Sequence, residues 1–449
     1  MAKKTKDSNL SLEERLEQAL IPNWDEPYKL PENWCWTRIS HLCSLSNGRA
    51  FKPTEWGTTG YPIVRIQNLN NPEVEYNYYS GNIEEKYKLV GGELLFAWSG
   101  TPGTSFGAHI WSGKEAVLNQ HIFRVDFNET YINKIFLKHA INQQLEMLIS
   151  AAHGGAGLQH VTKGVFEATP IPFPPLLEQE RIVARIESLF AKLDEAKEKA
   201  QEVVDGFETR KAAILHKAFS GELTAKWREE NGVSISNWEH HNFSDLCKIV
   251  RGGSPRPAGS PEFYGGDIPF MKVADITRIT TPYIESTEYF IKPAGLKKTR
   301  MVKANTLLLT NSGATLGVPA ICTFETTFND GIAAFLDLPS DSLLFYYYFW
   351  TLKTPELRAI NKGAAQPNLN TEIIGAVELD VPSAEEQKVI TKILEQLISK
   401  EQQAKEIAES VIEQIDTMKK AILARAFRGE LGTNDPSEES AVELLKKIL

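Results

Sequence analysis

Polar side chains that could hydrogen-bond to the edges of DNA bases gather in glycine-, asparagine- and proline-rich segments of this 449-residue chain. Arg, Lys, Asn, Gln, Ser and Thr carry the donors and acceptors that match base edges in the major groove. The first half of the chain supplies Arg49, Lys52, Gln67, Asn68, Ser99, Thr101, Thr104, Gln159, His160, Thr162 and Lys163. The second half supplies Arg251, Ser254, Arg256, Lys272, Thr277, Arg278, Asn311, Ser312, Thr315, Gln366, Asn368 and Asn370. Taken singly, each is better explained by ordinary turn chemistry. The matched positions of the two sets, filled by different residues, favour DNA reading.

The motifs of common catalysts are missing from the sequence. There is no G-x-x-x-x-G-K-[ST] phosphate loop, and the glycine-spaced "GGSPRPAGS" has no lysine before Ser260. No H-E-x-x-H or paired C-x-x-C is present, and four scattered cysteines are too few for a disulfide scaffold or a zinc site. An amino-methyltransferase tetrad N-P-P-[YF] is missing too, because Asn71 and Pro72 are followed by Glu73. The sequence therefore predicts a non-catalytic reader or scaffold, with no metal and no cofactor of its own.

The net charge, the N-terminal segment and the most apolar run limit the class of protein further. A net charge of −9 argues against binding nucleic acid by bulk electrostatics, so local basic loops or partner chains would have to neutralise phosphates. The N-terminal "MAKKTKDSNL" lacks the apolar core of a secretory signal. The most apolar run, "SLLFYYYFW", is nine residues long, well short of a membrane span. We expect a cytoplasmic protein.

The sequence segments that would form the elements positioning the polar loops occur twice in the chain. The segments "KAFSGELT" and "RAFRGELG" place Phe219 and Phe427 208 residues apart. The same offset relates Gln179 in "LLEQERI" to Gln387 in "AEEQKVI". A repeat of this length exceeds the periods of solenoid proteins, which run about 20–50 residues. It indicates a duplicated domain.

Two long amphipathic helices are predicted at the repeated segments, over residues 176–220 and 383–428. Apolar residues recur in alternating steps of three and four, which is typical of a coiled-coil seam. The seam positions are Ile182, Ile186, Leu189, Val203 and Phe207 in the first helix, and Ile390, Leu394, Leu397, Val411 and Ile415 in the second. Arg210 and Glu401 interrupt the seam, and Ser383 and Glu386 are spaced as a capping box. Helices of about 40 residues extend roughly 60 Å, and we expect the two to pair antiparallel.

The remaining chain forms two globular units that share one order of strands, helix and glycine-rich loop. "YPIVRIQNL", "ELLFAWSG" and "HIFRVDF" predict strands in the first unit; "DIPFMKVADI", "NTLLLTNSG" and "IAAFLDL" predict strands in the second. A helix is predicted over residues 131–152 and another in "SLLFYYYFWTLKTPEL". The predicted fold class is α+β: two mixed α/β domains joined by two long antiparallel coiled-coil helices, with a pseudo-two-fold internal repeat.

The predicted domain boundaries follow from these elements. They are an N-terminal arm with a short helix (1–28), a first globular unit (29–175), a long helix (176–220), a linker (221–235), a second globular unit (236–382), a second long helix (383–428) and a C-terminal tail with a short helix (429–449).

The "EQ" that opens each long helix and the "AF-x-GEL" that closes it make the chain resemble the specificity (S) subunits of Type I restriction–modification systems. The likeness covers nearly the whole chain, including "SLEERLEQALIPNWDEPYKLPENW" and "FRGELGTNDPSEESAVELLKKIL" at its ends. This resemblance implies two target recognition domains, each reading one half of a split, asymmetric site in double-stranded DNA. It implies that the helices set the half-site spacing and dock two methyltransferase (M) subunits, with restriction/translocase (R) subunits joining further out. S-adenosylmethionine, ATP and Mg would be bound by those partners.

Other interpretations remain open from the sequence. Aromatic residues in "NWCWT", "FAWSG" and "IWSG" could line a carbohydrate cleft in a duplicated binding protein. A coiled-coil scaffold carrying two passive domains would explain the helices but not the divergence of the units. An S-like subunit of a methylation-only system would share every feature described above.

Overall fold

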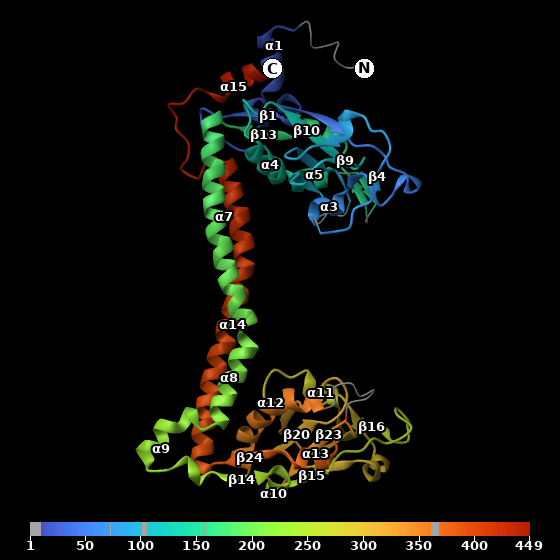
Figure 1. The fold of residues 1–449 in the computed structure, drawn as a ribbon, viewed down its shortest axis with the longest axis vertical. Helices are drawn as coiled ribbons and strands as arrows, with labels where there is room; N and C mark the ends of the chain where they lie inside the picture. The colour runs from blue at the N-terminus through green and yellow to red at the C-terminus, as the bar shows by residue number, and fades with distance from the viewer. Residues whose placement is uncertain (1–9, 72, 101–105, 152, 156–157, 361–367) are drawn as a thin grey trace. The chain divides into compact units, whose positions relative to one another are not determined.

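The computed structural model describes residues 10–71, 73–100, 106–151, 153–155, 158–360 and 368–449. It divides into two compact units, of which unit 1 contains residues 1–199 and 411–449 and unit 2 contains residues 200–410. Each unit combines a mixed α/β domain with an antiparallel pair of long-helix segments (Figure 1). The α+β class predicted from the sequence is confirmed.

The domain of unit 1 is a layered arrangement of short strands. The strands are β1 Cys35–Arg38, β2 Cys43–Asn47, β3 Tyr61–Val64, β4 Tyr78–Tyr79, β5 Lys88–Leu89, β6 Leu94–Ala97, β7 Ser99–Gly100, β8 Gly107–Ile110, β9 Ala116–Leu118, β10 Ile122–Phe127, β11 His153–Gly155, β12 Leu158–His160 and β13 Pro170–Phe173. One sheet has the antiparallel order β2-β10-β6-β8, and another has the order β4-β3-β9-β5 with β3 parallel to β9. β1 pairs with β13, and β12 lies between β11 and β7.

The domain of unit 2 repeats this topology. Its strands are β14 Glu239–Asn242, β15 Lys248–Arg251, β16 Tyr264–Met271, β17 Tyr283–Ile284, β18 Phe290–Ile291, β19 Arg300–Val302, β20 Thr306–Thr310, β21 Pro319–Cys322, β22 Thr326–Phe328, β23 Ile332–Leu336 and β24 Glu378–Val381. The order β15-β23-β20-β21 matches β2-β10-β6-β8, and β18-β16-β22-β19 matches β4-β3-β9-β5. The parallel pair recurs as β16 and β22. The duplication predicted from the helices therefore extends to the domains, which share little sequence.

Helices connect and cover these strands. In unit 1 they are α1 Leu12–Ala19, α2 Ile39–Leu42, α3 Ile66–Asn70, α4 Lys134–Gln143, α5 Leu145–Ser150, α6 Lys163–Ala168 and α15 Ala441–Ile448. In unit 2 they are α9 Ala225–Asn231, α10 Phe243–Leu246, α11 Val273–Thr277, α12 Leu343–Ile360 and α13 Thr371–Gly375. The helix predicted over residues 131–152 is divided at Gln144 into α4 and α5, and its last residue lies outside the described ranges.

Two predicted strands turn out to be half helix. "YPIVRIQNL" forms β3 and then α3, and "DIPFMKVADI" ends as α11. In each case the third helical residue caps the turn, because Asn68 Oδ1 accepts from Arg65 N at 3.2 Å and Asp275 Oδ2 accepts from Lys272 N at 2.8 Å. Strand-like apolar alternation therefore continues through a turn of helix that side-chain capping holds in place.

The long helices are α7 Leu176–Asp205, α8 Phe207–Phe219 and α14 Ala384–Phe427. The single helix predicted over 176–220 is thus interrupted at Gly206, where the residue without a side chain lets the Arg210 side chain fold back. Arg210 donates to Val203 O at 2.8 Å and pairs with Glu401 at 2.6 Å, both within unit 2. The two residues that interrupt the seam in the sequence are therefore partners of one another.

The seam residues pack in two different environments. Ile182 and Ile186 join the core of the unit 1 domain, and Ile390 and Leu394 join the core of the unit 2 domain. Phe207 and Ile415 are buried, whereas Leu189, Val203, Leu397 and Val411 are half-buried. The first turns of α7 and α14 are therefore anchored to a domain, and the helices contact mainly each other further along.

The repeated "EQ" and "GEL" letters have a shared structural explanation. Gln179 donates to Pro174 O at 3.0 Å and Gln387 donates to Pro382 O at 2.9 Å, so each glutamine closes the start of its helix. Gly221 and Gly429 take φ angles of +77° and +73°, the left-handed conformation that ends a helix most easily at glycine.

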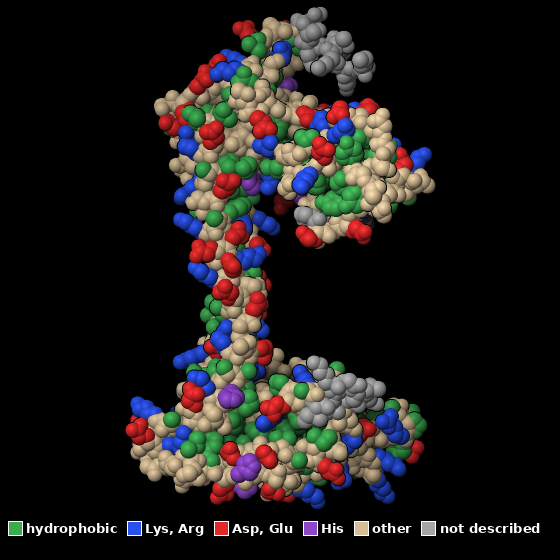
Figure 2. Space-filling model, in the orientation of Figure 1, with side chains coloured by type: hydrophobic (Ala, Val, Ile, Leu, Met, Phe, Trp, Pro, Cys, Tyr) green, Lys and Arg blue, Asp and Glu red, His purple; other side chains and the backbone are tan. Residues whose placement is uncertain are grey.

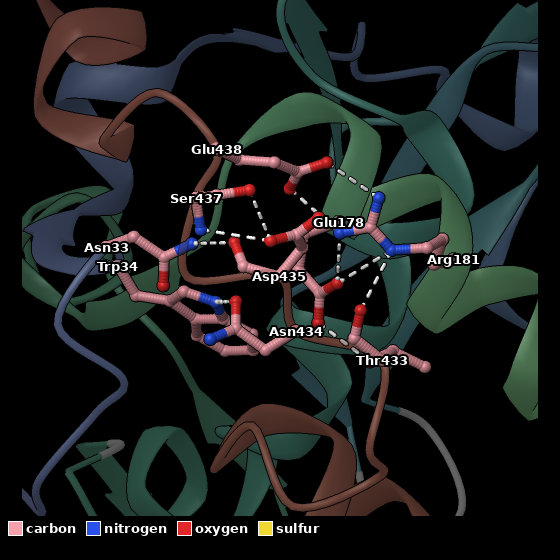
Figure 3. Close-up of polar contacts among 9 residues, drawn as sticks. All are labelled: Asn33, Trp34, Glu178, Arg181, Thr433, Asn434, Asp435, Ser437 and Glu438. Carbon is pink, nitrogen blue, oxygen red and sulfur yellow. Dashed lines mark hydrogen bonds and ion pairs between the residues drawn. The ribbon is translucent and has the colours of Figure 1, made fainter.

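In unit 1 the C-terminal tail completes the domain (Figure 3). The buried Glu178 accepts from Thr433 Oγ1 at 2.7 Å and from Arg181 at 2.8 Å, and Arg181 also pairs with Glu438 at 2.7 Å. Trp34 Nε1 donates to Asn434 Oδ1 at 3.1 Å. The tail is therefore part of the unit 1 fold rather than an appendage.

In unit 2 the segment after α8 occupies the equivalent place. The buried Glu386 accepts from Thr224 Oγ1 at 2.7 Å, from Arg228 Nη1 at 2.6 Å and from Trp238 Nε1 at 2.9 Å. The Ser383 hydroxyl caps α14 through Glu386 N at 3.3 Å. The Glu386 carboxylate is thus committed to this cluster, and the reciprocal half of the predicted capping box is replaced by tertiary contacts.

Candidate nucleic-acid interface

In unit 2, several loops that leave neighbouring strands meet at one polar corner. We define this corner by residues 251–254 at the end of β15, 272–273 at the start of α11, 311–312 after β20, 329–331 before β23, and Asn368. Asn311 N donates to Gly331 O at 2.9 Å, and Ser312 forms a β-bridge with Asn368. The side chains of Arg251, Arg256, Ser312 and Asn368 line a cavity of about 370 Å³.

Asp330 organises the charged side of this corner. Its carboxylate accepts from Ser254 Oγ at 2.6 Å and lies 3.6 Å from Arg256, and its backbone carbonyl accepts from Arg251 Nε at 2.7 Å. Asp330 therefore holds Arg256 through its half-exposed carboxylate and Arg251 through its backbone carbonyl, near the cavity. Two guanidinium groups and several neutral amide and hydroxyl groups are a donor-rich set suited to base edges and phosphates.

The corner depends on a close backbone approach at one glycine. A Cβ on Gly252 would lie 2.2 Å from Asn329 O, and a Cβ on Gly48 in unit 1 would lie 2.0 Å from Asn119 O. No other residue fits at either place without shifting the backbone. The same contact in both units shows that the two corners share one backbone frame.

The polar corner of unit 1 comprises residues 47–49, 65–66, 98–99, 119–121 and His160, at the same topological positions. Trp98 packs against the rings of His121 and His160 at centroid distances of 5.3 and 5.7 Å. Ser99 Oγ lies 2.9 Å from His160 Nδ1. Burial, together with the neighbouring His160, lowers the pKa of His121, so its ring is neutral near pH 7 and offers one donor and one acceptor.

Matched backbone hydrogen bonds define which residues correspond. Trp98 N donates to His121 O as Asn311 N donates to Gly331 O, and Val161 N donates to Trp98 O as Leu369 N donates to Asn311 O. Trp98 therefore corresponds to Asn311, His121 to Gly331 and His160 to Asn368. One corner is aromatic and imidazole-rich, and the other is rich in amides and guanidinium groups.

Unpaired buried polar atoms gather at these corners. In the described part of the chain, eleven buried side-chain nitrogen or oxygen atoms have no hydrogen-bond partner, and eight of them belong to corner residues. They are Arg49 Nη1, Arg65 Nε, Trp98 Nε1, Gln120 Oε1, His121 Nδ1, Asn311 Nδ2 and Oδ1, and Asn329 Oδ1. Because a buried polar group without a partner costs about 1–3 kcal/mol, these atoms make the corners candidates for binding a polar partner or water.

The residues predicted from the sequence are only partly brought together. Arg49, Ser99 and His160 lie in the unit 1 corner, and Arg251, Ser254, Lys272, Asn311, Ser312 and Asn368 lie in the unit 2 corner, with Arg256 beside it. Arg49 pairs with Glu55 at 2.5 Å, and Lys272 lies over the Tyr289 ring. Their contact with DNA stays a prediction.

Other predicted residues have local structural partners. Asn68 is buried and caps α3, while Thr162 and Asn370 cap α6 and α13. Lys163 donates to Leu45 O, Thr277 donates to Ala274 O, and Arg278 pairs with Asp275 and Glu288. Lys52, Gln67 and Thr315 are exposed at the surface, outside the corners. Thr101, Thr104 and Gln366, as well as the side chain of Gln159, lie outside the described part of the chain.

The sequence reasoning missed Arg65, Trp98, Gln120, Asn329 and Asp330. A signal for three of them was present, because "VLNQHIFRV" and "TFNDGIAAF" place an asparagine and a second polar residue at the same point before a strand. From the sequence, Trp98 of "FAWSG" was considered only as an aromatic residue of a carbohydrate cleft.

The aromatic residues that suggested a carbohydrate cleft are mostly core residues. Trp34, Trp36 and Trp111 are buried. Trp98 is half-buried in the unit 1 corner. An aromatic platform of the kind that lines sugar clefts is not formed by these described residues.

Comparison with known families identifies the class of protein. The family model described as Type I restriction modification DNA specificity domain matches residues 31–204 and again residues 235–411. The chain belongs to this family, and the resemblance inferred from the "EQ" and "GEL" motifs is confirmed.

Individual relatives agree over almost the full length. The chain is 27% identical over 444 residues to the Type I restriction enzyme EcoBI specificity subunit of Escherichia coli, covering 92% of this chain and 91% of that protein. It is 23% identical to the EcoKI specificity subunit of Escherichia coli strain K12, with 94% and 96% covered. The solved HsdS subunit from Thermoanaerobacter tengcongensis shares the fold, with a TM-score of 0.62, 22% identity, and coverage of 90% of this chain and 99% of that one.

No helix within the described ranges is long and apolar enough to cross a membrane.

Proposed function

We propose that this chain reads DNA for a Type I restriction–modification complex, with the polar corner of each unit reading one half of a bipartite, asymmetric site. The observation that carries this proposal is the contrast at matched positions. One backbone frame presents Trp98, His121 and His160 in unit 1, and Asn311, Gly331 and Asn368 in unit 2. A duplicated frame with different base-reading groups suits two different half-site sequences.

The long helices set the gap between the half-sites in this proposal. α14 runs without interruption for 44 residues, which corresponds to roughly 66 Å at 1.5 Å per residue. Anchoring of each helix start in a domain core, through residues such as Ile186 and Ile390, makes the helices suitable as rigid spacers. Changing their length by one heptad should change the gap and leave the half-sites unchanged.

Catalysis is assigned to partner chains. Two methyltransferase subunits dock on the helices and bind S-adenosylmethionine, and restriction/translocase subunits use ATP and Mg. The family membership and the absence of catalytic motifs from the sequence support a DNA-recognition role without catalysis for this chain. The complex would act on DNA in the cytoplasm.

The test is adenine methylation mapped over the genome by long-read sequencing, with the gene present, absent, or altered in one corner. Loss of one split motif with a fixed gap on deletion is expected. Substituting Ser312 and Asn368 by Ala should relax one half of the motif only, and the matched change of Ser99 and His160 should relax only the other half. Relaxation of both halves by either pair would refute modular reading, and no lost motif on deletion would refute the proposed function.

A further inference from the structure

Unit 2 carries a dense run of positive charge that the polar corner does not include. Between residues 292 and 303 the chain has five cations, Lys292, Lys297, Lys298, Arg300 and Lys303, and no acidic residue. We call this the basic segment. It comprises the short helix η7 Pro293–Lys298 and strand β19. Figure 2 shows Lys and Arg side chains over the part of unit 2 near β16. Strand β19 belongs to the same sheet as β16, and η7 contacts β16.

The charges of the basic segment are exposed and unneutralised. Lys297, Lys298, Arg300 and Lys303 are exposed. Within the described ranges, the ion pairs of unit 2 involve other cations, such as Arg256 and Arg278, and none joins a member of the basic segment to a carboxylate. Lys292 donates to Pro261 O at 2.7 Å and Arg300 donates to Arg251 O at 2.9 Å, so their partners are neutral carbonyls.

In the matched segment of unit 1, the positive charges are paired with carboxylates. This segment comprises the short helix η4 Glu85–Tyr87 and β5, which pairs with β9 as β19 pairs with β22. Its cations are neutralised locally, since Lys86 pairs with Glu84 at 2.7 Å and Lys88 pairs with Glu85. The two units therefore share topology at this place but differ in available positive charge.

The basic segment lies directly beside the polar corner of unit 2. Arg300 contacts the backbone of Arg251, a corner residue. A Cβ on Gly253 would lie 2.3 Å from Lys298 O, so the backbone of η7 touches the corner loop. A duplex whose base edges face the corner would bring its phosphates over this surface.

We propose that Lys297, Lys298 and Arg300 contact the phosphate backbone of the DNA next to the half-site read by unit 2, so that unit 2 supplies more electrostatic anchoring than unit 1. This inference rests on the proposed function. Phosphate contacts position a protein on DNA without reading sequence. The basic segment therefore sets affinity and salt dependence, and the corners set specificity. The net charge of −9 is compatible with this arrangement because the anchoring charge is local.

The experiment measures binding of a fluorescent duplex carrying the methylated motif by the complex assembled with its methyltransferase subunits, at several salt concentrations. Neutralising three phosphate contacts reduces the slope of log affinity against log salt by about 2–3, since each contact contributes about 0.9. The variant Lys297→Gln/Lys298→Gln/Arg300→Gln should show this change and bind the duplex about tenfold to a hundredfold more weakly near 0.15 M salt. The methylated motif should stay the same.

The control is Lys86→Gln/Lys88→Gln, which removes cations from the matched segment of unit 1 and should leave the slope nearly unchanged. An equal loss of slope in this control would overturn the asymmetry. An unchanged slope in the triple variant, or loss of methyltransferase binding by it, would overturn the phosphate contact. If the unaltered complex shows no preference for the motif duplex, the proposed function itself fails, and the two failures are thereby distinguished.

Discussion

The buried Glu386 gives the sharpest test of what stabilises unit 2. Its side chain is 1% exposed and that of its partner Arg228 is 9% exposed. Replacing Glu386 by Ala removes the acceptor of Arg228, Thr224 and Trp238 at once. Because the guanidinium charge stays buried without a counter-charge, unit 2 should lose about 3–5 kcal/mol of stability.

The matched residue Glu178 in unit 1 provides the control. Its partner Arg181 is 37% exposed and keeps a second carboxylate, Glu438, at 2.7 Å. Glu178→Ala therefore strands no charge, and the loss should be about 1–2 kcal/mol, mainly from the Thr433 hydroxyl that loses its acceptor. Glu178 and Glu386 occupy matching positions of the repeat, but their replacement should cause unequal losses of stability.

The assay is differential scanning calorimetry of the full chain, in which two units allow separate transitions. For a unit of this size, 1 kcal/mol corresponds to roughly 2–4 °C. Glu386→Ala should lower the transition of unit 2 by roughly 6–20 °C, and Glu178→Ala should lower that of unit 1 by a few degrees. Equal shifts in the two variants would refute the assignment of the effect to a stranded arginine charge.

Three further outcomes follow from the contacts. Ile186 is 1% exposed, so Ile186→Asp should destabilise unit 1 by about 3 kcal/mol or more in urea unfolding and weaken methyltransferase capture. Leu397→Asp, at a half-buried position, should lower the free energy of unfolding by less. Equal losses of stability in the two variants would contradict this reasoning. Gly252→Ala should displace Asn329 and erase one half of the methylated motif, and an unchanged motif would show that the corner tolerates the shift. Burial lowers the pKa of His139 to about 4, so native unit 1 favours the neutral ring. The stability it contributes is present above about pH 6.5 and lost as pH falls toward 4, and His139→Gln should flatten that part of a urea-midpoint profile against pH.

The frame of the fold could be predicted from the sequence because its signals are local and repeated. The "EQ" and "GEL" letters fix helix starts and ends through contacts a few residues away, such as Gln179 to Pro174. The break at Gly206 and the helical turns α3 and α11 were missed, since each depends on a side chain that folds onto nearby backbone. Apolar spacing carries no information about such contacts.

The candidate site was predicted less completely for a related physical reason. Polar loop residues are visible in a sequence, but their roles are decided by tertiary neighbours. Asn68 and Asn311 were both predicted as loop asparagines, yet Asn68 is satisfied by Arg65 N and Val74 O, while the Asn311 side chain is buried with no partner among the described residues. The basic segment could not be singled out from the sequence because the effect of its charge depends on carboxylates nearby in the fold. Lys86 and Lys88 of the matched unit 1 segment pair with carboxylates, whereas among the described residues no carboxylate pairs with the basic segment.

The two corners can carry different side chains at matched positions because the hydrogen bonds that hold these positions are made by the backbone. Trp98 and Asn311 occupy one position, and each is fixed by its own N–H and C=O to the facing strand and to the following helix start. Such bonds are the same for any residue except proline, which has no N–H. Substitution at this position therefore changes the side-chain groups at the corner, which we propose read DNA, while the frame keeps its hydrogen bonds. Glycine is the exception, as at Gly48 and Gly252, where the approach of another backbone leaves no room for a side chain. If the corners read DNA as proposed, a duplicated domain with these two kinds of position can change the sequence it recognises without changing its fold.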